Sequence, residues 1–92
     1  MHAAVESSSV SIVATVVQLS GTGMVIQSSH PLRPGSVYQV HLLGVVNVPP
    51  FPVRVLREQK TGPGRSRMRR FAAIIEGVDQ AWMESVVSSL LP

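Results

Sequence analysis

The chain of 92 residues carries 45% hydrophobic and 14% charged side chains, has a net charge of +3 and contains no cysteine. This length fits a single domain spanning residues 1–92, and the lack of cysteine excludes disulfides, thiolate metal ligands and a thiol nucleophile. No apolar run reaches the roughly 18 residues that span a bilayer, so we expect no membrane insertion and a cytoplasmic location.

The positive charge is concentrated in one segment. Residues 54–70 hold seven basic side chains against one acidic side chain, a net charge of +6, whereas the rest of the chain has a net charge of −3. Such a segment attracts an anion or an acidic surface. Nucleic-acid binding through it is a minor hypothesis, because the only aromatic residue near these charges, Phe71, is expected in the core rather than stacked on a base.

The first half of the chain predicts four strands. The ranges 3–5, 10–19 and 24–27 are apolar and rich in β-branched residues, although the run 10–19 does not show which face is buried. A strand almost from residue 3 suggests a domain taken from a longer protein. The range 36–43 alternates, so one face should carry Tyr38, Val40 and Leu42.

Prolines and glycines separate the later elements. Three prolines in residues 44–52 predict a reversal at a sheet edge or outside the sheet, with Phe51 either exposed at a contact or capping the barrel. The ranges 52–58 and 67–76 predict two further strands, joined by a loop rich in glycine. Short strands joined by such turns favour a closed or partly closed antiparallel barrel.

The hydrophobic period changes after Gly77. Asp79 is suited to cap a helix, because its carboxylate accepts hydrogen bonds from free backbone N–H groups. A helix over about 79–91 follows. A helix of about three turns is marginal alone, so it should pack on the open end of the sheet or offer part of its apolar face to a partner. That face holds Trp82, Met83, Val86, Val87 and Leu90.

The stretch most suited to recognition is Gln18-Leu19-Ser20-Gly21-Thr22-Gly23, between two apolar strands. Glycine allows a ligand to approach the backbone closely, and a serine hydroxyl both donates and accepts hydrogen bonds. A tight turn with no ligand is the alternative interpretation. The stretch is not a dinucleotide fingerprint, because a third glycine and a directly following helix are missing.

Together with the apolar strand 24–26, this stretch resembles the PilZ motif, in which Asp or Asn, any residue, Ser, two residues and Gly precede a strand. The turn at 32–38, the strand at 52–57 and the strand at 69–75 before the helix resemble later parts of that family. The resemblance implies an all-β dominated fold: a six-stranded antiparallel PilZ-like β-barrel with one C-terminal α-helix.

The resemblance also implies a non-enzymatic domain associated with cyclic di-GMP signalling, which binds the dinucleotide or acts as an adaptor beside a partner protein or an adjacent domain. In the family, an N-terminal Arg-x-x-x-Arg pair grips the phosphates and stacks on guanine. This chain has Gln18 in place of Asp or Asn, and no arginine precedes the motif. The same spacing recurs later, so the candidate ligand-binding residues are Gln18, Ser20, Gly21, Gly23, Arg65 and Arg69.

Two alternatives to nucleotide binding stay open. One is a degenerate PilZ-like protein-interaction module that binds no nucleotide, which the missing arginine pair and Gln18 favour. The other is nucleic-acid binding through residues 54–70. Catalysis is not expected, because the sequence sets no carboxylate or nucleophile beside a histidine, and no metal or cofactor is expected, because metal-ligand spacing is absent.

Overall fold

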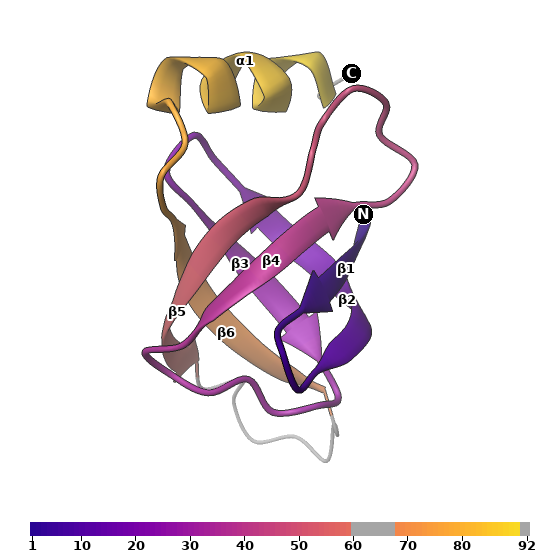
Figure 1. Cartoon of the computed structure of the whole chain (residues 1–92), viewed down its shortest axis with the longest axis vertical. Helices are drawn as coiled ribbons and strands as arrows, with labels where there is room; N and C mark the ends of the chain where they lie inside the picture. Colours follow the sequence, from indigo (N-terminus) through magenta and orange to yellow (C-terminus); the bar gives the residue numbers. More distant parts are fainter. Residues whose placement is uncertain (60–67, 91–92) are drawn as a thin grey trace.

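The computed structural model describes residues 1–59 and 68–90, which form six strands and one helix (Figure 1). The helix lies at one end of the barrel. The elements are β1 (His2–Glu6), β2 (Ser11–Leu19), β3 (Gly23–Ser28), β4 (Val37–Leu42), β5 (Phe51–Gln59), β6 (Arg69–Ile75) and α1 (Gln80–Leu90).

The strands close into a barrel in the order β1-β2-β3-β6-β5-β4. Every neighbouring pair is antiparallel, and the pairing of β1 with β4, from Ala3 opposite Leu42 to Glu6 opposite Gln39, completes the circle. Closure leaves no strand edge unpaired, which protects a small sheet from pairing with another chain. The predicted six-stranded antiparallel barrel with a C-terminal helix is therefore confirmed.

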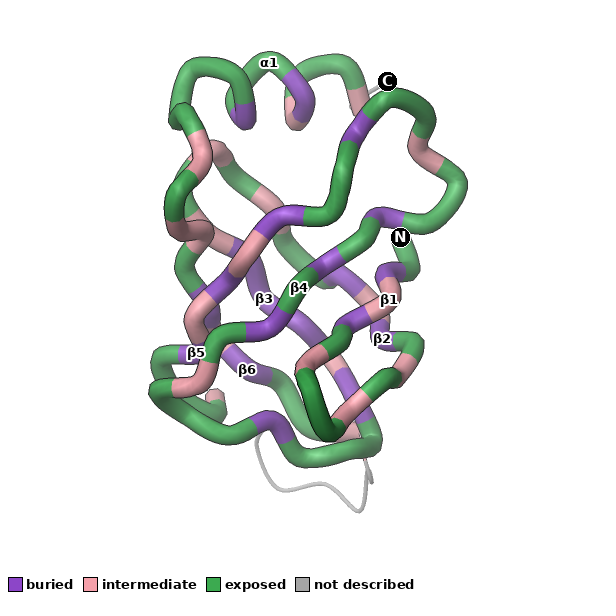
Figure 2. The backbone as a smooth tube through the Cα atoms, in the orientation of Figure 1, coloured by how far each residue is buried: buried purple, intermediate pink, exposed green. Residues whose placement is uncertain are grey.

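The core fills the inside of the barrel through regular alternation along the strands (Figure 2). In β4, Tyr38, Val40 and Leu42 are buried and the residues between them are exposed, as the sequence predicts. The largest side chains that are almost fully buried are all apolar: Phe51, Phe71, Ile26, Leu42, Met83, Val5, Val40, Val53 and Val55.

Two β-bulges shift the alternation. One lies between Val16 and Gln18 in β2, and the other lies between Val55 and Arg57 in β5. Each bulge leaves two consecutive side chains outside the barrel, because the extra residue breaks the alternation of period two. Val17 and Gln18 are both exposed in β2, and Leu56 and Arg57 are both exposed in β5. In β2, the faces that the sequence left undetermined are now assigned, with Ala14 and Val16 inside.

The proline-rich reversal ends one residue earlier than the sequence predicts. Strand β5 begins at Phe51 instead of Pro52, and Pro52 lies within the sheet opposite Gln39. Proline is tolerated at the start of a strand, because only its missing N–H is lost to the ladder. Its carbonyl still accepts a hydrogen bond from the Glu76 N–H at 3.0 Å. Phe51 is 2% exposed, so it belongs to the core and is not a surface contact.

Helix α1 covers one end of the barrel. Asp79 caps it as predicted: Oδ1 accepts from the Trp82 N–H at 3.0 Å. Met83 and Val86 are buried against the core, whereas Trp82 is 38% exposed. The predicted apolar face is thus correct for Met83 and Val86 but too wide for Trp82. Among the residues described, no helical segment is long and apolar enough to cross a membrane.

Candidate functional site

Residues 18–23 span the connection between β2 and β3, at the end of the barrel that α1 covers. This connection borders an open hollow of about 350 Å³. Gln18 is exposed there and Val25, its cross-strand partner, forms part of the wall. The hollow is lined by Gln18, Leu19, Ser20, Gly23, Met24 and Val25. The structure therefore gathers three of the predicted ligand-binding residues, Gln18, Ser20 and Gly23, around one opening.

The Ser20 hydroxyl is engaged within the turn. Its Oγ accepts from the Gly23 N–H at 3.2 Å and from the Thr22 N–H at 3.4 Å, and it lies 3.3 Å from the Gly23 carbonyl oxygen, to which it donates. The Ser20 N–H donates to the same carbonyl at 2.9 Å. These contacts are those of a serine that stabilises a tight turn.

Because of these contacts, Ser20→Ala should lower the free energy of unfolding by about 1 kcal/mol with no ligand present, the usual scale for a neutral hydrogen bond. Urea unfolding followed by circular dichroism measures this change. Ser11→Ala is the matched control, because Ser11 is exposed on β2. Equal stability of the Ser20 and Ser11 variants would show that the turn does not depend on this hydroxyl.

Gly21 and Gly23 both lie against neighbouring parts of the protein. Neither has a positive φ; within residues 1–59 and 68–90 the glycines that do are Gly35, Gly44 and Gly77. A Cβ on Gly23 would lie 2.7 Å from the carbonyl oxygen of Ala73 in β6, and a Cβ on Gly21 would lie 2.2 Å from Cγ of Glu84 in α1. The close approach that glycine permits here is that of a neighbouring strand and of the helix. A ligand is not needed to explain either residue.

Arg69 lies far from this turn. Gly23 pairs with Ile74 and Ser28 pairs with Arg69, so the length of β3 separates Arg69 from the turn, which is roughly 17 Å at about 3.4 Å per residue. The Arg69 guanidinium forms a two-point ion pair with Glu58, with Nε–Oε2 and Nη2–Oε1 distances of 2.8 and 2.6 Å. Arg65, its predicted partner, lies outside the described residues.

The ion pair also shifts the pKa values of both partners. Hydrogen bonds from Arg69 hold the pKa of the Glu58 carboxyl below its ordinary value, and the same bonds raise the pKa of Arg69. The guanidinium also lies 5.8 Å from the centre of the Phe71 ring, within the range of a cation–π contact. The Arg69 guanidinium is therefore already held by Glu58 and Phe71, at the end of the barrel opposite α1.

Two other arginines share the outer face of the motif. Four cross-strand partners form a row across the sheet, from β2 through β3 and β6 to β5: Gln18, Val25, Ala72 and Arg57. Two residues along β3 from Val25, Gln27 pairs with Arg70 of β6. Arg70 Nε donates to the Gln27 side-chain oxygen at 3.0 Å. With strands about 4.8 Å apart, three steps across the sheet set Arg57 roughly 14 Å from Gln18.

Sequence reasoning missed both arginines for different reasons. Arg70 alternates with the core residues Phe71 and Ala73 along β6, in which Arg70 is exposed, so the sequence did contain a signal for its outward position. Simple alternation from Val53 and Val55 assigns Arg57 to the inside of the barrel, but the bulge after Val55 turns Arg57 to the outer face. No signal in the sequence marks that bulge.

The basic segment is partly neutralised where it is described. Arg54 donates to both carboxylate oxygens of Glu76, and Arg69 pairs with Glu58. Two of its four described arginines thus face carboxylates, which weakens the case for nucleic-acid binding, since phosphate contacts need free cations. Within residues 1–59 and 68–90, no cluster of three or more His, Cys, Asp or Glu side chains could hold a metal ion.

The chain was compared with protein-family models, with curated proteins and with solved structures. No match was found in any of the three comparisons.

Proposed function

We propose that the protein is a non-enzymatic PilZ-like module of cyclic di-GMP signalling. In this proposal the dinucleotide binds on the outer face of β2, β3, β6 and β5, beside the turn 18–23. The observation that carries the proposal is the ladder register, which sets Arg57 and Arg70 on the same face as Gln18. The six-stranded antiparallel barrel and the C-terminal helix are those that the PilZ resemblance implies.

The two arginines supply the chemistry that the missing N-terminal pair supplies in that family. A guanidinium forms paired hydrogen bonds to phosphate oxygens and stacks on a planar base. The hydrogen bond to Gln27 uses only Nε of Arg70. In this proposal the two terminal nitrogens of the Arg70 guanidinium bind a phosphate of the ligand. Gln18 offers an amide that both donates and accepts hydrogen bonds at a base edge.

Titration calorimetry with cyclic di-GMP tests the proposal. We expect saturable binding that weakens about tenfold or more in Arg70→Gln and in Arg57→Gln, the usual effect of losing a charge-assisted hydrogen bond. Arg69→Gln is the matched control: it removes the same charge from the neighbouring residue, whose guanidinium is paired with Glu58 at the barrel mouth, and should leave the affinity unchanged. Circular dichroism of each variant confirms that the barrel is intact.

Binding that falls in Arg69→Gln but not in Arg70→Gln would contradict this site and favour the arginine pair that the sequence predicts. Absence of heat from a folded protein would remove direct binding by this chain. That result would favour the alternative hypothesis of a PilZ-like module that binds a protein and no nucleotide. Exposed apolar side chains at and beside the α1 end favour that alternative, since Val46, Leu43 and Trp82 are 81%, 40% and 38% exposed.

A further inference from the structure

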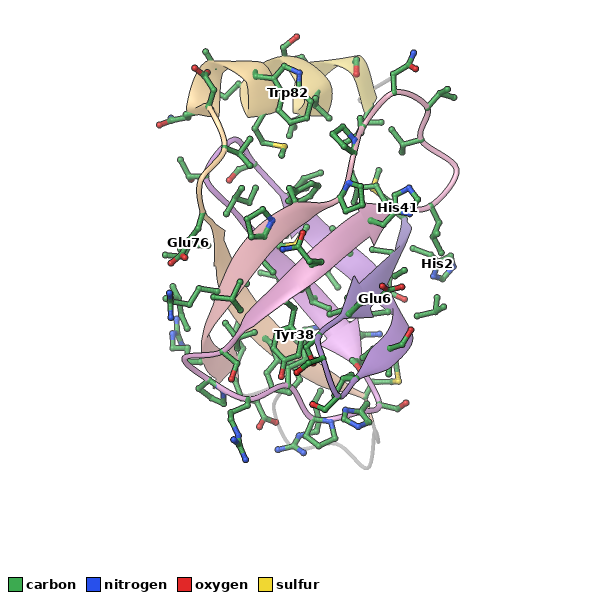
Figure 3. All side chains as sticks on the ribbon, viewed as in Figure 1. His2, Glu6, Tyr38, His41, Glu76 and Trp82 are labelled. Atoms are coloured by element: carbon green, nitrogen blue, oxygen red, sulfur yellow. The ribbon has the colours of Figure 1, made fainter. Side chains whose placement is uncertain are left out.

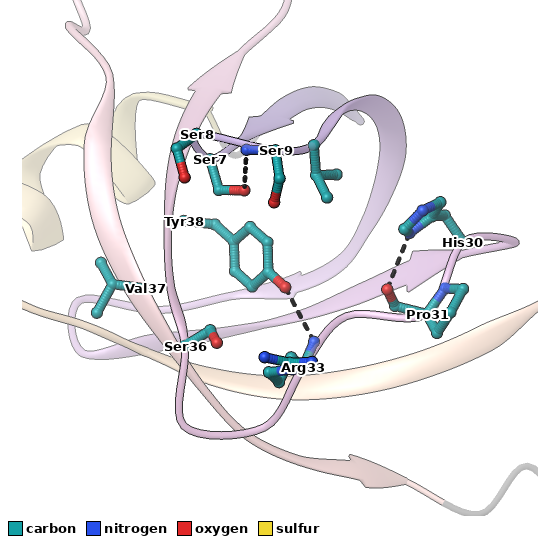
Figure 4. A pocket seen from close by; sticks show the side chains of 10 residues that line it. Ser7, Ser8, Ser9, His30, Pro31, Arg33, Ser36, Val37 and Tyr38 are labelled. Carbon is teal, nitrogen blue, oxygen red and sulfur yellow. Dashed lines mark hydrogen bonds between the residues drawn. The ribbon is translucent and has the colours of Figure 1, made fainter.

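A second hollow lies at the opposite end of the barrel from α1, and we call it the serine hollow (Figure 4). Its volume is about 460 Å³, the size of a small-molecule site. Its walls are the β1–β2 connection, with Ser7, Ser8 and Ser9, and the β3–β4 connection, from His30 to Ser36. Tyr38 in this hollow and Trp82 on α1 mark the two ends of the barrel (Figure 3).

Tyr38 contributes a buried hydroxyl to the serine hollow. The residue is 5% exposed, and its Oη accepts from the Arg33 backbone N–H at 2.9 Å. A phenol that accepts one hydrogen bond still carries its own proton for donation. No acceptor for that proton is recorded among the described residues, and Figure 4 shows the ring reaching across the hollow. The phenol is therefore positioned to donate to a ligand.

The serines add further donors. Ser7 Oγ accepts from the Ser9 N–H at 3.3 Å, which leaves the Ser7 hydroxyl proton free of that contact. The hydroxyl groups of Ser8 and Ser36 make no recorded hydrogen bond within the described residues and line the same hollow. Hydroxyl groups rotate to suit an acceptor, so a ligand oxygen entering here meets donors from both connections.

The charge of the serine hollow is positive. Among its lining residues are Arg33 and His30, and none is an aspartate or a glutamate. The two ion pairs found in the described part of the chain use Arg54 and Arg69, so Arg33 is not neutralised by either. His30 Nδ1 lies 2.9 Å from the Pro31 carbonyl oxygen, which only accepts, so Nδ1 donates to it and the imidazole ring is oriented by its own loop.

We propose that the serine hollow binds the phosphate group of a small phosphate monoester. A phosphate accepts many hydrogen bonds, and a guanidinium with several hydroxyl groups matches its oxygens. The hollow is larger than a phosphate alone needs, and Val10, Pro31 and Val37 provide apolar surface for the carbon part of the ester. The two proposed sites share no residue, because the serine hollow is lined by the β1–β2 and β3–β4 connections with Val37 and Tyr38, whereas the proposed cyclic di-GMP site lies on the outer face of β2, β3, β6 and β5.

Nitrogen-15 NMR titration of the whole chain tests this proposal, with inorganic phosphate and phenyl phosphate as probes at constant ionic strength. We expect saturable shifts at residues 7–10 and 30–38, none at 18–23, and tighter binding of phenyl phosphate. Arg33→Gln should weaken binding about tenfold or more. This variant keeps the backbone N–H that bonds Tyr38, so the fold is retained. Tyr38→Phe, the second variant, should weaken binding several-fold.

Arg69→Gln is the matched control, because Arg69 does not line the hollow. An equal loss in Arg33→Gln and Arg69→Gln would overturn the proposal and show unspecific attraction of an anion. Shifts that do not saturate, or that spread over the outer face of the barrel, would overturn it as well. Equal affinity for the two probes would overturn the assignment to an ester. A result here leaves the cyclic di-GMP titration unaffected, because the two sites share no residue.

Discussion

Gly23→Ala should lower the free energy of unfolding by about 2–3 kcal/mol, near the top of the usual range for overpacking in a well-packed region. The added Cβ would lie 2.7 Å from the Ala73 carbonyl oxygen. That oxygen is backbone, in a strand that pairs with β3 on one side and with β5 on the other, so it cannot move aside without disturbing two ladders.

Thermal unfolding followed by circular dichroism measures this effect, and we expect a midpoint roughly 10–20 °C below that of the parent chain. Gly21→Ala is the control within the same turn. Its Cβ would meet the Glu84 side chain, which is exposed and can change rotamer, so the cost should stay below about 1 kcal/mol. Equal costs at the two positions would contradict the close approach of β3 and β6.

This prediction changes how the motif glycine is interpreted. A loss of nucleotide binding in a Gly23 variant would follow from damage to the β3–β6 ladder even if no ligand ever touched Gly23. Arg57 and Arg70, which are exposed on the outer face, provide the informative variants instead. The binding hypothesis therefore rests on side chains outside the motif that suggested it.

Most of the strand and helix positions could be predicted because they depend on local patterns. The alternation in β4 identified Tyr38, Val40 and Leu42 as core, and Asp79 identified the start of α1. The sequence predicts the start of β5 one residue late, at Pro52 instead of Phe51, and leaves open whether Phe51 is exposed or caps the barrel. Its burial depends on the closed barrel, which local propensity does not describe.

The candidate site could be predicted only in part, because it depends on which strands become neighbours. The turn that holds Ser20 is local and was found. The pairing of β3 with β6 is not local, and it decides that Arg70 lies beside Gln27. Residues adjacent in sequence on a strand point to opposite faces, so a one-residue difference separates the proposed ligand contact of Arg70 from the ion pair of Arg69 with Glu58.

Met83→Ala should lower the free energy of unfolding by about 2–4 kcal/mol, the usual cost of emptying a fully buried methionine site. Met83 is 0% exposed and belongs to the main core cluster, so α1 contributes a side chain to the interior of the barrel. Trp82→Ala is the control on the neighbouring position. Although tryptophan is larger, Trp82 is 38% exposed and should cost about 1 kcal/mol or less.

Urea unfolding separates the two variants, with circular dichroism reporting on the barrel. In Met83→Ala the single tryptophan, Trp82, also reports on the helix by fluorescence. A cost below about 1 kcal/mol for Met83→Ala would contradict a core role for α1. If the cost lies in the expected range, a protein partner could not bind the Met83 side of α1 without opening the core. Such a partner would have to contact the side of the helix that carries Trp82.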